Sequence, residues 1–237
     1  MAGTGNARFN LKYAKNKLGW ANELAMAYGL LVQYEKDDRR KTDDKLEYKS
    51  ELSYKASANW NYTWVTEFKT QFDRGYKSYP VKDGDSYIST FMSPAYLSLS
   101  LGMDYKPTKE FSLFMSPFSV KNTIVLDDTL ANNGVYKVDP NKKIRSEYGA
   151  TVIVTYKKKL RENINFMSNL TLFSNLAENP QNVDLNVTFD FDFKITKWLS
   201  TKLYAQLKYD DDISVSEEKG PALQLKEVMG LGLSYSF

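Results

Sequence analysis

The sequence predicts an all-β protein: a transmembrane up-and-down antiparallel β-barrel of about twelve strands, of which about eleven are visible in the chain. Three observations lead to this fold class. Apolar and polar residues alternate along nearly all of the 237 residues. The connections between the alternating segments are short and long by turns. Aromatic residues, which make up 14% of the chain, gather beside the short connections.

The alternation is clearest in residues 20–34. The even positions, from Trp20 to Tyr34, are mostly large and apolar, and the odd positions, from Ala21 to Gln33, are mostly small or polar. A helix would instead place its apolar residues three and four positions apart. Similar segments are 60–72, 95–105, 148–156, 183–195, 199–209 and 231–237, with weaker ones at 7–13, 44–56, 111–126 and 164–174. Roughly 10 residues cross the apolar band of an outer membrane, so most of these strands are long enough to cross it.

The connections follow the layout of an outer-membrane barrel, which has tight periplasmic turns and longer outer loops. The short connections are 15–19, 57–59, 106–109, 158–163 and 196–197, and the long polar ones are 35–44, 73–86, 127–145, 175–182 and 211–222. Aromatic residues of the apolar face beside the short turns predict an interfacial girdle. They are Tyr13, Trp20, Tyr54, Trp60, Tyr105, Phe111, Tyr156 and Tyr235.

The order of the connections also predicts the number of strands. The final strand ends on the periplasmic side because its last connection, 211–222, is long, and counting back places the start of the strand at 7–13 on the outer side. A single-chain barrel of this kind closes with an even number of strands. We therefore expect one more strand upstream of residue 6, and a single barrel domain over residues 1–237. The alternative is a smaller barrel, if two weak strands within 87–126 are miscounted.

The direction of the apolar face separates two classes of protein. In a soluble β-barrel or sandwich, the apolar face points inward. Here that face carries large residues throughout, too many for a closed interior, and the polar face is rich in Gly, Ala, Ser and Thr, which suits a crowded lumen. The C-terminal strand, with Phe237 last, resembles the assembly signal of bacterial outer-membrane proteins. We therefore predict that the apolar face contacts lipid, and that the mean hydropathy of −0.50 averages two opposite faces.

The polar face supplies the candidate functional residues, which are charged side chains of both signs. The candidates are Glu23, Glu47, Lys49, Glu51, Glu67, Lys69, Asp104, Glu147, Asp190, Asp192, Lys194, Lys202 and Lys208, together with Arg8, Lys12, Lys55, Lys157, Asp184 and Lys226. One hypothesis is a passive channel for small polar solutes, whose charged residues set its selectivity. The other is a closed interior in which the charges pair across neighbouring strands, as in a structural subunit of a larger complex. Lys69 beside Glu67 and Lys194 beside Asp192 illustrate such pairing.

The composition argues against an enzyme. The chain has no histidine and no cysteine, so it lacks the commonest general base, the commonest transition-metal ligand and any thiolate site. We expect no cofactor and no resident metal, although Asp127, Asp128 and Asp210, Asp211, Asp212 at loop ends could either ligate calcium or remain solvated. The basic residues form no interleaved basic and aromatic patch, which argues against nucleic acid. Lysines at the short turns are compatible with lipid phosphates.

Three residues interrupt the alternation. Pro94 and Pro117 lie in strand-like segments and indicate bulges or bends, because proline cannot donate to a strand ladder. Glu227 falls on the apolar face by strict count. It marks either a bulge that restores the phase or a contact with another protein.

Several segments resemble those of one protein family. They are Gly19-Trp20-Ala21-Asn22-Glu23-Leu24, Ala27-Tyr28-Gly29-Leu30-Leu31, Ser93-Pro94-Ala95-Tyr96-Leu97, Gly102-Met103-Asp104-Tyr105-Lys106-Pro107, Phe111-Ser112-Leu113-Phe114-Met115-Ser116-Pro117, Leu126-Asp127-Asp128-Thr129-Leu130, Leu172-Phe173-Ser174-Asn175, Glu178-Asn179-Pro180-Gln181-Asn182, Tyr209-Asp210-Asp211-Asp212 and Lys226-Glu227-Val228-Met229-Gly230. Together they look like a family of Bacteroidota outer-membrane β-barrel proteins catalogued as a domain of unknown function. The resemblance implies location in the bacterial outer membrane, with outer-membrane lipids as partners and other outer-membrane proteins as candidate partners, and it transfers no catalytic residue.

Overall fold

The structure is a computed structural model that describes residues 2–33, 38–77, 79–81, 84–210 and 222–233. Eleven strands form one sheet in chain order: β1 (Ala2–Lys15), β2 (Leu18–Gln33), β3 (Asp38–Lys55), β4 (Trp60–Thr70), β7 (Ala95–Tyr105), β8 (Phe111–Ile124), β9 (Ile144–Arg161), β10 (Ile164–Asn175), β11 (Val183–Lys194), β12 (Leu199–Tyr209) and β13 (Gln224–Leu233). The short strands β5 (Gly75–Tyr76) and β6 (Tyr87–Ser89) form a separate pair. The helical segments are α1 (Asp128–Asn132) and the 3₁₀ turn η2 (Val135–Lys137).

The predicted all-β class and the predicted eleven strands are confirmed. Each strand pairs with its neighbour in sequence, which is the up-and-down order. β7 and β8 are both full members of the sheet, so the alternative of a smaller strand count is wrong. Within the described residues, β1 and β13 are the outer strands of the sheet and no pairing joins them. The predicted terminal residues Tyr235 and Phe237 lie outside the described residues.

Two predicted loops are shorter than expected. β3 begins at Asp38, so most of the predicted loop 35–44 is strand, and β9 begins at Ile144 rather than at residue 148. The additional residues at the start of β3 pair with the end of β2, from Gln33↔Asp38 to Gly29↔Asp43. Residues 38–44, at the start of β3, are highly charged, so they carry no apolar alternation by which the sequence could reveal the strand.

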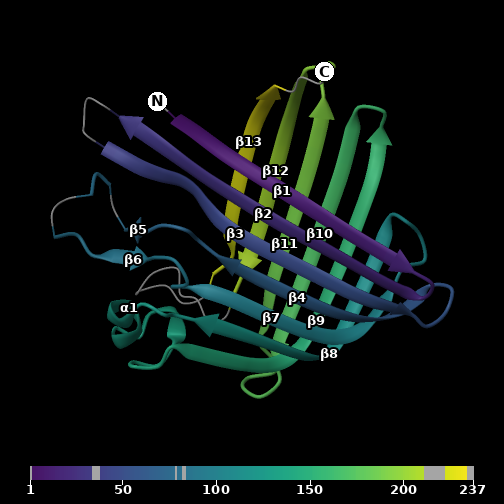
Figure 1. Cartoon of the computed structure of the whole chain (residues 1–237), viewed down its shortest axis with the longest axis horizontal. Coiled ribbons are helices and arrows are strands. Elements are labelled where there is room, and N and C mark those ends of the chain that lie inside the picture. Colours follow the sequence, from purple (N-terminus) through teal and green to yellow (C-terminus); the bar gives the residue numbers. More distant parts are fainter. Residues whose placement is uncertain (1, 34–37, 78, 82–83, 211–221, 234–237) are drawn as a thin grey trace. The chain divides into compact units, whose positions relative to one another are not determined.

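By their contacts, the residues divide into two compact units. Unit A comprises residues 1–54, 64–100 and 120–147, and unit B comprises residues 55–63, 101–119 and 148–237. Figure 1 shows β1, β2 and β3 side by side within unit A, and β10 to β13 side by side within unit B. No helix in the described part of the chain is long and apolar enough to span a membrane.

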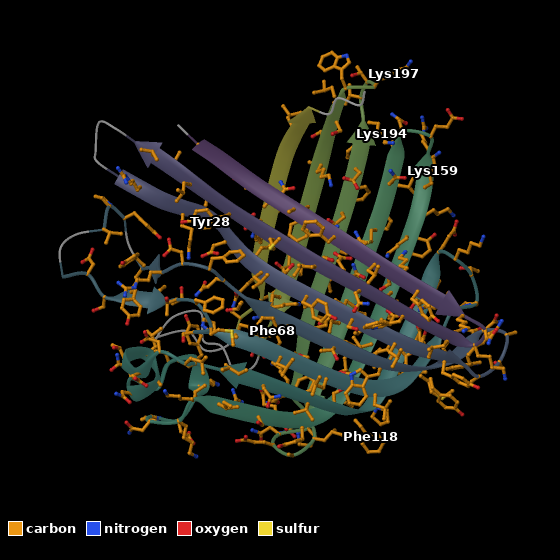
Figure 2. The ribbon with its side chains drawn as sticks, viewed as in Figure 1. Tyr28, Phe68, Phe118, Lys159, Lys194 and Lys197 are labelled. Atoms are coloured by element: carbon orange, nitrogen blue, oxygen red, sulfur yellow. The ribbon has the colours of Figure 1, made fainter. Side chains whose placement is uncertain are left out.

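Burial in both units is the reverse of that in a water-soluble protein. In unit A, Phe9 and Leu11 are 59% and 64% exposed, whereas the Glu147 side chain is buried. In unit B, Phe118 is 74% exposed and projects from the ribbon in Figure 2, whereas Thr63 and Asp104 are buried. An exposed large apolar patch next to a buried polar face signals a surface that water does not cover. We call the two sides of the sheet the apolar face and the polar face.

The predicted bulge at Pro117 is confirmed by the burial along β8. Phe114 and Ser116 are buried before the proline, and Ser119 and Thr123 are buried after it. The buried positions therefore change from even to odd, which requires one extra residue in the strand. The Ser116 hydroxyl lies 2.8 Å from the carbonyl oxygen of Phe118 within this bulge. Pro94, by contrast, lies just before β7, after a turn in which Thr90 and Ser93 exchange backbone hydrogen bonds.

Two long connections of unit A fold together into a small cap, which we define as residues 71–94 and 125–143. Val125, Leu130, Ala131 and Val138 form its buried core, against which Tyr87, Val135 and Tyr136 pack. Tyr136 donates a hydrogen bond to the Ile88 carbonyl (2.6 Å), which joins η2 to β6. Figure 1 shows α1 beside these short strands.

Candidate functional site: the charged network of the polar face

In unit A, charged side chains from β1 to β4 meet on the polar face. Glu23 lies directly opposite Lys49 in the register of β2 and β3. Lys49 Nζ is 3.2 Å from Glu67 Oε1 on β4, and Lys69 Nζ is 3.9 Å from the other carboxylate oxygen of Glu67. Opposite charges on neighbouring strands stabilise a sheet. Lys49 is such a cross-strand partner of Glu67. The predicted pairing of Lys69 with Glu67, two residues apart on β4, is also confirmed.

Further ion pairs lie on the polar face beside the contacts of Glu67 with Lys49 and Lys69. Arg8 Nε on β1 lies 3.4 Å from Glu23 Oε1. Lys45 Nζ lies 3.9 Å from Glu47 Oε2, on the same side of β3. Glu51 faces Ala21 in the register of β2 and β3. The side chains in these pairs keep between a quarter and two thirds of their exposure, so water reaches them.

A second cluster in unit A lies between β8 and β9. Glu147, which is 4% exposed, has one carboxylate oxygen 3.8 Å from Lys121 Nζ and the other 3.5 Å from Arg145 Nη2. A buried carboxylate is tolerated only when cations or hydrogen-bond donors compensate its desolvation. Lys121 and Arg145 together compensate the Glu147 carboxylate.

In unit B, Asp104 of β7 occupies a similar position. It is 2% exposed, forms an ion pair with Lys106 and accepts a hydrogen bond from the Ser112 hydroxyl of β8 at 2.8 Å. Asp104, which the sequence predicted as a lumen-lining candidate, is therefore buried and compensated by Lys106 and Ser112 rather than exposed to water.

The strands β11 and β12 carry a further row of pairs in unit B. Asp192 Oδ1 lies 3.1 Å from Lys202 Nζ, its direct partner in the register. The suggested pairing of Asp192 with Lys194 is thus replaced by a cross-strand pair, because neighbouring strands place opposite side chains closer than two residues of one strand. Lys208 pairs with Asp210 (3.5 Å), and Asp190 lies opposite Tyr204. Between them, Gln206 donates a hydrogen bond to Asn186 (2.7 Å).

Four cations of these clusters were not among the residues predicted from the sequence: Lys45, Lys106, Lys121 and Arg145. Lys121 joins the polar face only because the bulge at Pro117 changes the phase of β8, so applying the predicted bulge would have found it. Arg145 shares its face with Glu147, but the sequence placed the start of that strand at residue 148. Lys106 follows Asp104 on the same face and was assigned to a turn.

The acidic pair Asp127-Asp128 has a structural role in the cap. Asp127 is the N-cap of α1, accepts hydrogen bonds from the Leu130 amide (3.0 Å) and the Tyr87 hydroxyl (2.9 Å), and Asp128 pairs with Lys143 (2.8 Å). The hydrogen bond from Leu130, assisted by Tyr87, lowers the pKa of Asp127. Within the described residues, no group of three acidic side chains is arranged to hold a metal ion, and Asp211 and Asp212 lie outside them.

A second anchor joins the cap to β2 and β3. Asp44 accepts hydrogen bonds from the backbone amides of Phe72 (2.7 Å) and Asp73 (3.0 Å) and from Lys41 Nζ (2.6 Å). Tyr28 donates to Asp73 Oδ2 (2.9 Å). The hydrogen bond from the Arg74 amide, together with the one from Tyr28, lowers the pKa of Asp73. The cap is thus held by carboxylates that act as hydrogen-bond acceptors.

Comparisons with known proteins found a matching family model and a similar solved structure. A family model described as "Protein of unknown function (DUF3078)" matches residues 1–76. A solved structure titled "NanC porin structure in rhombohedral crystal form" is similar at 8% sequence identity and a TM-score of 0.43, covering 99% of this chain and 99% of that one. Similarity at this level assigns neither a function nor a solute. No curated protein matches the chain.

Proposed function

We propose that the protein is an integral β-barrel of a Gram-negative outer membrane, of the kind found in Bacteroidota, and that its polar face lines a passive pathway for small polar solutes. The observation that carries this proposal is the reversed burial of the two faces. Large apolar side chains lie on the exposed face, and carboxylates, lysines and hydroxyls lie on the other. In a membrane, lipid covers the first face and water the second.

The dimensions of the apolar face support a membrane-spanning sheet. On β11, the apolar face runs from Val183 to Phe193. At about 3.3 Å per residue this length is about 33 Å, which at a tilt of about 40° spans about 25 Å of membrane thickness. That thickness is the height of the apolar band of an outer-membrane barrel.

Aromatic residues support the same boundary at the short turns. Trp60 and Tyr105 contact each other at 4.7 Å between ring centroids beside the turns at 56–59 and 106–110. Phe166 contacts Phe191 at 4.7 Å near the turns that follow β9 and β11. Rings at this level are typical of the interface between lipid and water.

The charged network determines the kind of solute. Acidic and basic side chains lie 3.1 to 3.9 Å apart, across neighbouring strands in the pairs Lys49–Glu67 and Lys202–Asp192 and along β4 in the pair Lys69–Glu67. Paired charges produce a weak net field but many hydrogen-bonding positions. We therefore expect a small polar solute to pass with weak preference for either charge.

Planar bilayer recordings test the pathway. We expect discrete current steps from the folded protein. Glu67→Gln should move the reversal potential in a salt gradient toward anion selectivity, because it leaves Lys49 and Lys69 without their shared carboxylate. Glu162→Gln, in the short turn after β9, is the matched control and should leave the reversal potential unchanged. A folded protein that never gives current steps refutes the channel.

One observation favours a second function, that of a non-conducting subunit of a larger outer-membrane complex. The register of β12 and β13 runs without a shift from Leu199↔Leu233 to Lys208↔Gln224 and places Glu227 opposite Ala205. Of the two alternatives for Glu227, the bulge is therefore wrong, and the carboxylate lies on the apolar face. Ala205 in turn lies opposite Phe189, near the middle of the lipid-facing band. A protein partner covering Glu227 would remove a cost of up to about 2 kcal/mol.

Purification from native membranes tests this second function. A partner that copurifies at fixed stoichiometry with the wild type, and is lost with Glu227→Leu but kept with Leu225→Ala on the same face, supports it. Stoichiometric recovery that is unchanged by Glu227→Leu contradicts the role of Glu227 as a contact.

A further inference from the structure

The end of unit B that carries the short turns has cations without acidic partners. We define the basic rim as Lys158, Lys159 and Arg161 at the end of β9, and Lys194 and Lys197 at the turn between β11 and β12. Figure 2 shows Lys159, Lys194 and Lys197 at the same end of these strands. Within the described residues, none of the five forms an ion pair, whereas Lys202 and Lys208 of the adjacent polar face are each paired with an aspartate. Glu162 is the acidic residue in these two turns.

The two turns of the basic rim contact each other. The Lys194 amide donates to the Asn163 carbonyl (2.8 Å), and the Asn163 side-chain amide donates to the Lys194 carbonyl (3.3 Å). Thr196 accepts hydrogen bonds from the amides of Trp198 (3.2 Å) and Leu199 (2.9 Å). These bonds hold the turn backbones that carry Lys194 and Lys197 next to the turn that follows Arg161.

A continuous aromatic surface lies directly below this rim on the apolar face. Tyr156, Phe166, Phe191 and Phe193 follow one another with ring centroids 6.3, 4.7 and 6.1 Å apart. Lys158 lies opposite Phe166 in the register, and Ile164 lies opposite both Arg161 and Phe193. These two cations therefore emerge from the apolar face itself, immediately beyond the rings.

The turns also expose apolar side chains. Leu160, Ile195 and Trp198 are 47%, 55% and 54% exposed beside the lysines. Water disfavours an exposed indole and two exposed aliphatic side chains. The same side chains beside lysines suit the boundary between lipid headgroups and acyl chains, where indole rings concentrate. The chemistry that fits the whole surface is an anion attached to hydrocarbon.

We propose that the basic rim and the aromatic surface below it bind the acidic phospholipids of the adjacent leaflet, with headgroup phosphate at the rim cations and acyl chains on the aromatic rings. This inference rests on the proposed membrane-embedded barrel. Each basic residue near an anionic lipid surface contributes about a fivefold preference at low salt, and screening by salt weakens that preference. Several cations acting together therefore select acidic over zwitterionic phospholipids.

Fluorescence quenching by brominated lipids tests the proposal. Trp198 is kept as the sole tryptophan by the substitutions Trp20→Phe, Trp60→Phe and Trp64→Phe, and the protein is reconstituted into vesicles of phosphatidylcholine containing brominated phosphatidylglycerol. The measured quantity is the association constant of phosphatidylglycerol at Trp198 relative to that of brominated phosphatidylcholine. We expect a ratio of about fivefold or more at low salt, falling toward one at high salt.

Two variants decide the origin of this ratio. Lys158→Gln, Lys159→Gln, Arg161→Gln, Lys194→Gln and Lys197→Gln, combined, should lower the ratio to near one. The matched control Lys202→Gln, Lys208→Gln and Lys226→Gln, which removes cations of the polar face from the same unit, should leave it unchanged. A ratio near one in the parent, or an unchanged ratio in the rim variant, overturns the proposal.

Two further outcomes distinguish the lipid site from a site for a free anion and from failure of the proposed membrane barrel. A ratio that collapses on addition of inorganic phosphate at constant ionic strength assigns the cations to a free anion and overturns the lipid site. Failure of the protein to insert into vesicles of either composition refutes the membrane barrel itself, whereas insertion without lipid preference refutes the lipid site alone.

Discussion

Neutralising Glu147 should destabilise the protein more than removing any exposed carboxylate. Glu147 is 4% exposed, and its carboxylate lies 3.8 Å from Lys121 Nζ and 3.5 Å from Arg145 Nη2. At an effective dielectric constant of about 20, each contact is worth about 4–5 kcal/mol before desolvation. Removing one member of a buried ion pair costs about 3–5 kcal/mol, because the remaining charges lose an interaction that offset their desolvation.

For Glu147→Gln we expect a loss of about 3 kcal/mol, at the low end of that range. Lys121 and Arg145 keep 23% and 22% of their side-chain exposure, so water screens part of their repulsion. The assay is urea unfolding of the protein in lipid vesicles, followed by tryptophan fluorescence and by heat-dependent gel mobility.

Two controls make this prediction specific. Asp139→Asn removes a carboxylate that pairs with Lys142 at the surface, where both side chains are about two thirds exposed, and should cost less than about 1 kcal/mol. Glu147→Gln combined with Lys121→Gln should recover part of the loss, because one of the two cations that paired with the carboxylate is also removed. A loss for Glu147→Gln no larger than that for Asp139→Asn would refute the conclusion that the polar face contains a buried, compensated charge.

Three further predictions follow from other parts of the structure. Leu101→Arg should cost about 2–4 kcal/mol in vesicles although Leu101 is 47% exposed, because that exposed surface meets lipid; equal stability in the same urea assay would indicate water there. Gly102→Val should impair folding, measured as the yield of the heat-modifiable species, because a Cβ at Gly102 would collide with the Met115 carbonyl; Gly230→Val, with open space around its Cβ position, is the control, and similar yields would count against the close approach of β7 and β8. The cap should loosen in acid: the lowered pKa of Asp127 adds stability that is complete above its ordinary pKa and is lost as pH falls through the lowered value, and Asp127→Ala should remove about 1 kcal/mol at neutral pH. Hydrogen exchange at the Leu130 amide measures this, and protection that does not change between pH 6 and pH 2 after correction for intrinsic exchange would contradict it.

The period of the sequence was sufficient to predict the strands and their faces. Alternation through 183–195 placed Phe189 and Asp190 on opposite faces, and the structure pairs them with Ala205 and Tyr204 accordingly. The sequence could not predict the partner of Asp192. That partner is set by the register of β11 against β12. Alternation alone does not fix this register, because a shift of two residues leaves every side chain on the same face.

Irregular features limited the rest of the prediction. Lys121 was missed because the single extra residue at Pro117 changes the phase of β8. The cap was predicted only as polar loops, because the four residues of its core, Val125, Leu130, Ala131 and Val138, are spread over one connection without a period. Such a core depends on tertiary contacts with Tyr87 from another loop, and these have no local signature.

Cysteine accessibility along β11 tests the central claim most directly, and the chain is suited to it because it has no native cysteine. The variants V187C, T188C, F189C and D190C are reconstituted into vesicles and treated with a membrane-impermeant, water-soluble maleimide present on both sides of the bilayer. The account predicts rapid labelling at 188 and 190 and protection at 187 and 189, with the protection lost after unfolding in detergent. Labelling at all four positions, or protection at 188 and 190 with labelling at 187 and 189, would contradict a sheet whose apolar face contacts lipid and whose polar face contacts water.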